Sequence, residues 1–173
     1  KESGTLFAIP TYGFIAAVAA LFIGGLIAAL SGHPIRAESA NLPIDTPTLT
    51  GFALVLLVLR SFASGCTALT GVEAVSNGVP FFRKPKSRNA ALTLVAMGTI
   101  AISMFAGVTW LAISSGVKFA ENPAELGLPA DAVQPTVIAQ LGMAVFGSSG
   151  IGFYLLQAFT AAILILAANT AFN

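Results

Sequence analysis

One acidic residue of this sequence lies within an apolar stretch long enough to cross a membrane. Glu73 occurs in GCTALTGVEAVSNGVP (65–80), where three glycines and a proline interrupt an otherwise apolar run. A charge at membrane depth is energetically costly, and a helix break there leaves backbone groups without partners. A carboxylate placed beside a helix break is therefore a candidate for cation or proton chemistry.

The residues around Glu73 favour an interrupted helix. Gly65 and Gly71 each lower helix stability by about 1 kcal/mol relative to alanine. The hydroxyls of Thr67 and Thr70 can bond to the backbone and compete with the helical ladder. The interruption would expose carbonyl groups at the end of the first half-helix, which suit a cation, and N–H groups at the start of the second, which suit an anion.

These groups define the predicted site. We expect the substrate-binding residues to be Thr67, Thr70, Gly71, Glu73 and Asn77. Burial favours the protonated form of a carboxylate, so Glu73 is also the candidate for proton coupling. For a potassium substrate, Thr70 and Glu73 would supply the oxygen ligands that a hard cation prefers. For an amino acid, the N–H groups would hold its carboxylate and the carbonyls its ammonium group.

Two interpretations of nearby residues remain open. Glu73 could instead belong to a kinked helix and contact a neighbouring helix for packing alone. Arg60, mid-way along the first half-helix, must face protein or water; it is a possible gate or one half of a structural ion pair.

The elements that hold this site are predicted from composition and hydropathy. Of 173 residues, 56% are hydrophobic and 9% charged, and the mean hydropathy is +0.88; soluble domains carry roughly 25% charged residues. Apolar runs longer than the roughly 20 residues that cross a bilayer predict an all-α integral membrane protein, because barrel strands are about half as long. The predicted spans are 6–30, 50–82 (broken near 65–72), 89–116 and 149–172.

Two further features concern packing and the membrane surface. Gly24 and Gly25 in the first span would let a neighbouring helix approach closely. The shorter apolar segment TVIAQLGMAVFG (136–147) predicts a helix that lies on the membrane surface.

Charge in the loops predicts the orientation. The loop RKPKSRN (83–89) carries four basic residues and no acid, and basic residues favour the cytoplasmic side. We expect a multi-pass protein of the cell membrane with this loop and both chain ends in the cytoplasm. Because the chain opens with Lys1 and stops within AANTAFN, we expect it to be part of a longer polypeptide whose remaining helices contact these.

The motifs give no support for catalysis. The one histidine, His33, precedes a proline in a loop, and no Ser–His or His–acid arrangement accompanies it. A phosphate-binding glycine loop with a lysine is absent from the sequence, so ATP drive within this chain is not expected. Cys66 is the one cysteine, which excludes an intrachain disulfide. We expect no enzyme activity, no cofactor and no nucleic-acid partner; the partners are membrane lipid and a small solute.

Several stretches resemble a known family. TGVEAVSNGVP followed by RKPKSRNAA resembles the sixth helix and the next loop of the amino acid–polyamine–organocation (APC) permeases. SGTLFAIPTYGFI resembles their helix five, residues 89–116 helix seven, and FYLLQAFTAAILILAANTAFN helix eight. The resemblance implies a fragment of a five-plus-five inverted-repeat (LeuT-like) transporter, whose first and sixth helices break around the substrate.

The residues at the predicted helix break indicate which permeases of this superfamily the chain resembles more. Amino acid permeases of this superfamily often carry GFE or GFD there, with an acidic pair before the basic loop, and both are absent here. TGVEA is similar to the proton-coupled potassium uptake (KUP) permeases, in which the matching threonine and glutamate contribute to cation binding and coupling; this implies such roles for Thr70 and Glu73. The favoured function is potassium uptake driven by the proton gradient. The alternatives are an amino acid permease and a non-transporting membrane scaffold.

Overall fold

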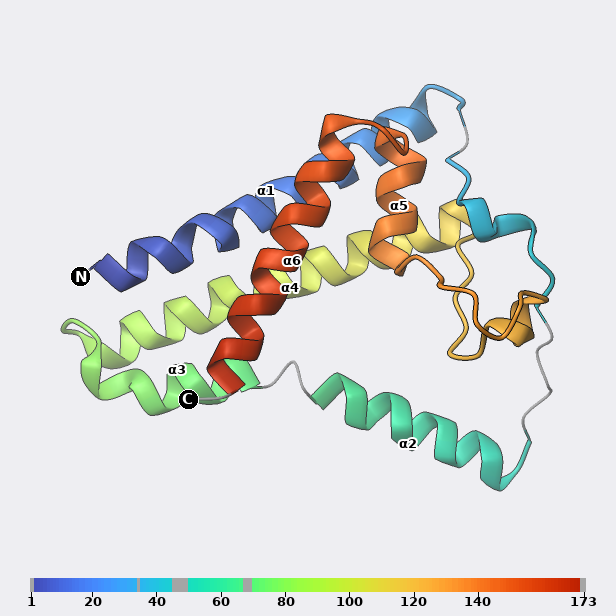
Figure 1. The fold of residues 1–173 in the computed structure, drawn as a ribbon. Helices are drawn as coiled ribbons and strands as arrows, with labels where there is room; N and C mark the ends of the chain where they lie inside the picture. Colours follow the sequence, from blue (N-terminus) through green and yellow to red (C-terminus); the bar gives the residue numbers. More distant parts are fainter. Residues whose placement is uncertain (1, 34, 45–49, 67–69, 172–173) are drawn as a thin grey trace. The chain divides into compact units, whose positions relative to one another are not determined.

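The computed structural model describes residues 2–33, 35–44, 50–66 and 70–171, and within these ranges the chain forms helices and no strand (Figure 1). This confirms the predicted all-α class. The α-helices are α1 (Glu2–Leu30), α2 (Phe52–Cys66), α3 (Thr70–Gly78), α4 (Lys86–Ser115), α5 (Val137–Phe146) and α6 (Ile151–Ala171), and the 3-10 helices are η1 (Glu38–Asn41), η3 (Val79–Phe81) and η4 (Pro123–Leu126).

Three of the described helices are long and apolar enough to cross a membrane. They are Ala8–Leu30 within α1, Lys86–Ser115 and Ile151–Ala168 within α6, and they match the first, third and fourth predicted spans. Two shorter helices, α2 and α3, stand where the sequence predicts one interrupted span. Residues 67–69, between them, lie outside the described residues. The apolar helices support the predicted membrane location, whereas the side of the membrane that each loop faces stays a prediction.

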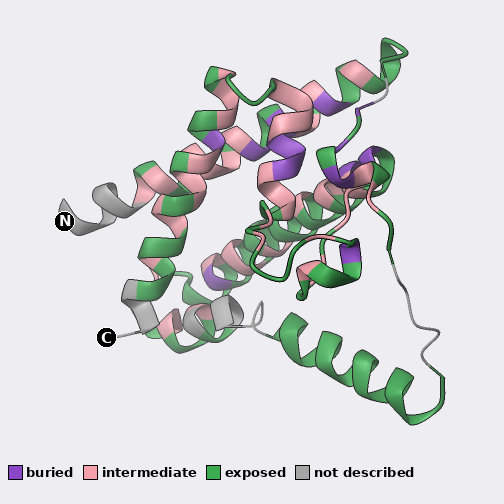
Figure 2. Ribbon diagram, turned by 45° about the vertical axis from the view of Figure 1, so that its right-hand side comes forward, coloured by how far each residue is buried: buried purple, intermediate pink, exposed green. Residues whose placement is uncertain are grey.

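The chain divides into two compact units. The first unit contains α1, η1, η4, α5, α6 and the part of α4 from Met104 onward; the second contains α2, α3, η3 and α4 up to Ser103. The first unit has a core to which four helices contribute (Figure 2). Its fully buried side chains include Val18 and Leu21 of α1, Leu111 of α4, Leu141 of α5 and Leu156 of α6.

Glycines let the helices of the first unit approach closely, as the sequence predicted. A Cβ at Gly24 would lie 2.7 Å from Cγ1 of Val145 on α5, and a Cβ at Gly25 would overlap the side chain of Leu111 on α4. Because side chains from neighbouring helices fill the space above these glycines, α1 contacts α4 and α5 without a gap. Small residues are the usual means of close packing between membrane helices.

Two of these helices end in the same way. Gly32 after α1 and Gly116 after α4 have φ of +71° and +67°, and the residue after each glycine donates its N–H to the carbonyl five residues back, at 3.1 and 3.2 Å. This is the Schellman arrangement, which glycine favours because it adopts positive φ readily. The N–H of Ala37 then donates to the carbonyl of Ser115 at 3.0 Å. The C-terminal ends of α1 and α4 therefore lie on the same side of the first unit.

Candidate functional site

The predicted site belongs to the second unit, at the start of α3. Glu73 lies in the first turn of this helix, and its side chain is exposed. Asn77 follows four residues later and is also exposed. Residues four apart share one face of a helix, so the structure brings Glu73 and Asn77 to the same exposed face of α3.

The other predicted ligands are only partly described. Thr67 lies outside the described residues. Thr70 and Gly71 open α3, and the side chain of Thr70 is not described. The arrangement of the predicted potassium ligands around Glu73 therefore stays a prediction.

The structure gives the helix ends on either side of residues 67–69, which themselves lie outside the described residues. α2 ends at Cys66 and α3 begins at Thr70. The last carbonyl groups of a helix and its first N–H groups have no partner within that helix, and they carry partial negative and positive charge respectively. Binding of a cation at the end of α2 and of an anion at the start of α3 stays a prediction.

Arg60 lies mid-way along α2. Its side chain is exposed, as is every residue of α2 (Figure 2). An arginine in the middle of an apolar helix needs a polar surrounding within a membrane. Its role as a gate or as part of a structural ion pair stays a prediction.

A preformed cluster of metal ligands does not occur in the part of the chain that the structure describes, where no group of three or more His, Cys, Asp or Glu side chains comes together. Carboxylate, carbonyl and hydroxyl oxygens are ligands that suit a hard cation, and the ligands predicted around Glu73 are of this kind.

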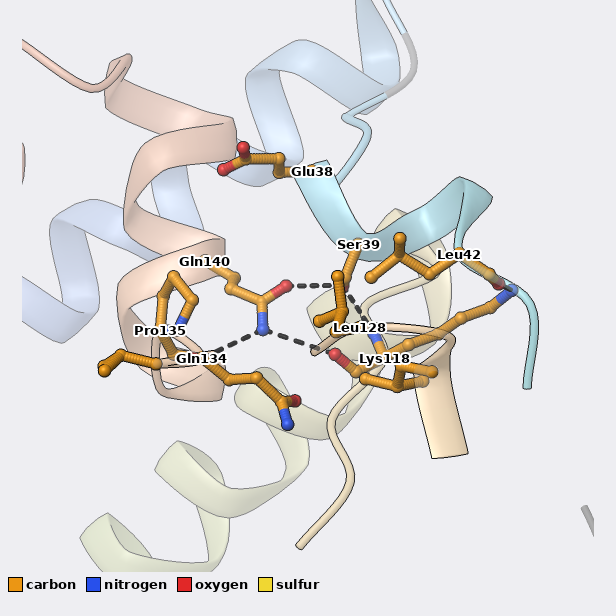
Figure 3. A pocket seen from close by; sticks show the side chains of 10 residues that line it. Glu38, Ser39, Leu42, Lys118, Leu128, Gln134, Pro135 and Gln140 are labelled. Atoms are coloured by element: carbon orange, nitrogen blue, oxygen red, sulfur yellow. Dashed lines mark hydrogen bonds between the residues drawn. The ribbon is translucent and has the colours of Figure 1, made fainter. Parts of the chain in front are cut away.

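A second polar cluster, in the first unit, escaped the sequence analysis. Ser39 of η1, Lys118 after α4 and Gln140 of α5 border a cavity of about 310 Å³ (Figure 3). Ser39 donates a hydrogen bond from its hydroxyl to Oε1 of Gln140 and accepts one from the backbone N–H of Lys118 at 2.8 Å. Nε2 of Gln140 donates to the carbonyls of Lys118 at 3.3 Å and Pro135 at 3.0 Å.

The hydrogen bonds of this cluster hold parts of the first unit together. The side chain of Gln140 is 3% exposed, and its amide uses both N–H donors and its oxygen in the bonds above. Nζ of Lys118 donates to the carbonyl of Leu42 at 2.6 Å. A buried polar group is stable when its hydrogen bonds are made, so the cluster joins the segments that follow α1 and α4 to α5.

Two signals could have drawn attention to polar residues of this kind. Gln140 is the polar residue inside the apolar run VIAQLGMAVF, and Gln157 occupies a similar place inside α6. The two residues differ in the structure, because Nε2 of Gln157 is buried and has no hydrogen-bond partner within the described residues.

Comparison with known proteins adds the remaining evidence. No family model matches the chain. The potassium transporter KimA of Bacillus subtilis (strain 168) is 40% identical to it over 173 residues, which is 100% of this chain. This chain is similar to a potassium transporter. It spans 26% of the length of that relative, so the activity and substrate of the whole protein are the subject of a proposal.

Proposed function

We propose that this chain is part of a secondary transporter that takes up potassium. The observation that carries the proposal is the 40% identity to the potassium transporter KimA along the whole chain. The three apolar helices long enough to cross a membrane are compatible with it. An amino acid substrate has no such support from the relative, and a non-transporting scaffold does not account for a carboxylate next to a helix break. An enzyme function has no support either.

The finer assignment is a permease of the KUP type, built on the APC inverted repeat, with this chain as helices five to eight. It rests on the sequence resemblance of the break and of the flanking helices. In this arrangement α2 and α3 are the two halves of helix six, and the basic loop 83–89 faces the cytoplasm. The helices of the other repeat would complete the site beside Glu73.

The proposed transport chemistry uses the two helix ends. Potassium binds to carbonyl oxygens at the end of α2 and to oxygens of Thr70 and Glu73, with Thr67, Gly71 and Asn77 lining the site. Proton binding to Glu73 neutralises the carboxylate and weakens the cation site, which would couple ion release to the proton gradient. Glu73 lies in the first turn of α3 with an exposed side chain, so the burial on which its coupling role rests would have to come from the remaining helices of the full-length protein.

The function is tested by competition. The full-length protein is reconstituted in vesicles, and uptake of labelled rubidium is measured with unlabelled potassium or single amino acids as competitors. The proposal expects potassium to reduce rubidium uptake and amino acids to leave it unchanged. Uptake of an amino acid that rubidium does not affect would contradict the potassium assignment.

The role of Thr70 is tested by removing its hydroxyl. Thr70→Ala should raise the KM for potassium roughly 10- to 150-fold, since a lost ligand to a charged group weakens binding by roughly 1.5–3 kcal/mol. Thr99→Ala is the matched control, because the Thr99 hydroxyl donates to the carbonyl of Val95 within α4. Equal KM values for the two variants would exclude Thr70 from the site.

A further inference from the structure

A short basic segment joins α3 to α4 in the second unit. We call residues 79–89, which include η3 and the first residues of α4, the basic turn. Its four cationic side chains, Arg83, Lys84, Lys86 and Arg88, are all exposed. No acidic residue occurs in the sequence between Glu73 and Glu121. Like charges held this close repel one another, so an external anion would stabilise the segment.

Hydrogen bonds fix the backbone of the basic turn and leave the cations on its outside. Nζ of Lys86 donates to the carbonyl of Pro80 at 2.5 Å, and Nδ2 of Asn89 donates to the carbonyl of Arg83 at 2.9 Å. Each bond joins two residues that are six positions apart in the sequence. An ammonium group has three donors, so the bond of Lys86 to Pro80 leaves it able to bind an anion as well.

The first turn of α4 adds backbone donors to these cations. The N–H of Asn89 donates to the carbonyl of Pro85 at 3.1 Å, which places the start of the helical ladder. The N–H groups of Lys86, Ser87 and Arg88 precede this bond and have no acceptor within the helix. The N-terminus of a helix attracts anions, phosphate in particular, and arginine binds phosphate through paired N–H donors.

The basic turn adjoins a helix that is long and apolar enough to cross a membrane. This helix, α4, begins at Lys86, and the first turn of a membrane-spanning helix is expected at the membrane surface. Phe81 is 90% exposed, while Phe82 is half-buried, with its ring 3.9 Å from where a Cβ at Gly78 would lie. An exposed aromatic ring beside basic residues is typical of segments at the boundary between lipid tails and headgroups.

We propose that the basic turn binds the phosphate headgroup of an anionic phospholipid. Arg83 and Arg88 contact the phosphate together with the N–H groups at the start of α4, and the ring of Phe81 lies against the upper part of the acyl chains. A soluble phosphate would use the same donors but gives no reason for an exposed phenylalanine beside them. This site is independent of the potassium site, because it uses none of the residues assigned to transport.

The test measures lipid preference in the full-length protein. Fluorescent phosphatidylglycerol and phosphatidylcholine are titrated into the purified protein in detergent. Wild type should prefer phosphatidylglycerol. Each basic residue near an anionic surface strengthens binding about fivefold, so the double variant Arg83→Gln/Arg88→Gln should lower this preference roughly 30-fold. Arg83→Lys/Arg88→Lys should retain most of it. Arg36→Gln, which removes an exposed cation from the first unit, should change nothing.

Three results would overturn the proposal. The first is equal preference in wild type and the glutamine variant. The second is displacement of the lipid by inorganic phosphate or by an acidic peptide at millimolar concentration, which would indicate a site for soluble anions or for a protein partner. The third test uses wild type alone and does not depend on the folding of the glutamine variant. Photoactivated phosphatidylglycerol should crosslink to residues 79–89. Crosslinks confined to other segments would contradict the assignment.

Discussion

The polar residues of the two units lie in contrasting surroundings. In the first unit, Gln140 is 3% exposed, and its hydrogen bonds reach η1, the segment after α4 and the segment before α5. In the second unit, Glu73 and Asn77 are exposed on α3. Among the residues of this unit whose burial is described, Ala90 alone is buried, and most of the others are exposed (Figure 2). In the first unit a buried polar side chain joins segments that are distant in the sequence, whereas the polar side chains of α3 in the second unit are exposed at the start of a helix. We therefore place the proposed solute chemistry in the second unit.

Two glycines of α4, one in each unit, also lie in contrasting surroundings. A Cβ at Gly107, in the first unit, would lie 2.6 Å from ring atoms of Phe22 on α1. A Cβ at Gly98, in the second unit, would meet nothing within 4 Å in the described structure. One end of α4 is thus fitted to a neighbouring helix. The other end presents its surface to lipid or to further helices.

The largest expected effect comes from one substitution made at two glutamines. Gln140→Leu leaves the Ser39 hydroxyl and the carbonyls of Lys118 and Pro135 without their partner. It should destabilise the protein by at least about 3 kcal/mol, at about 1–3 kcal/mol for each of the three groups left unsatisfied. Gln157→Leu removes a buried donor that already lacks a partner, so it should leave stability unchanged or raise it by up to about 1 kcal/mol.

The measurement is the Tm of the full-length protein in detergent, with each variant compared with wild type. A lower Tm for Gln140→Leu alone would sharpen the contrast between structural and unpartnered polar groups. Equal losses at the two positions would show that hydrogen bonding inside the first unit is not what distinguishes them.

A smaller effect is expected at the two glycines of α4. Gly107→Ala forces the ring of Phe22 to move, and overpacking of this kind lowers stability by about 1–3 kcal/mol. Gly98→Ala adds a methyl group into open space and should raise stability by up to about 1 kcal/mol through helix propensity. The same Tm measurement checks both. If both variants lose stability equally, Gly98 must pack against a part of the full-length protein.

The smallest effect is expected at Lys118. Lys118→Met removes the bond from Nζ to the carbonyl of Leu42 but keeps the backbone N–H that donates to Ser39. The loss should be about 1 kcal/mol, which is typical of one partly exposed hydrogen bond. Arg36→Met, at an exposed position in the same unit, is the control. A loss as large as that of Gln140→Leu would show that the side chain of Lys118, rather than the amide, holds the loops.

Hydropathy was sufficient to predict the long helices, because a span of more than 20 apolar residues has few other solutions in lipid. The boundaries moved by a few residues: α1 begins at Glu2 and contains Pro10, whereas the sequence indicated a start near Leu6. The helix at 136–147 was also predicted, and its packing against α1 and α6 was not. That contact depends on side chains such as Val145 meeting Gly24, which a single sequence does not reveal.

The sequence singles out residue types for the candidate site, and both their roles and their surroundings stay predictions. The sequence pointed to Glu73 because a carboxylate within an apolar run is costly in a membrane and usually has a function there. The sequence did not point to Ser39 and Gln140, because they are 101 residues apart and each is an ordinary polar residue in its own segment. Only the fold brings such a pair together, and the same limit applies to whatever residues surround Glu73 in the full-length protein.

The central claim is that Glu73 couples potassium uptake to the proton gradient, and one substitution tests it most directly. Full-length Glu73→Gln is reconstituted in vesicles, and potassium accumulation is measured with and without an imposed proton gradient. Glu125→Gln, an exposed acid of η4 in the first unit, is the matched control. The account predicts that the control accumulates potassium as wild type does, and that Glu73→Gln folds but no longer responds to the proton gradient. Accumulation by Glu73→Gln against the potassium gradient at the wild-type level would contradict the account.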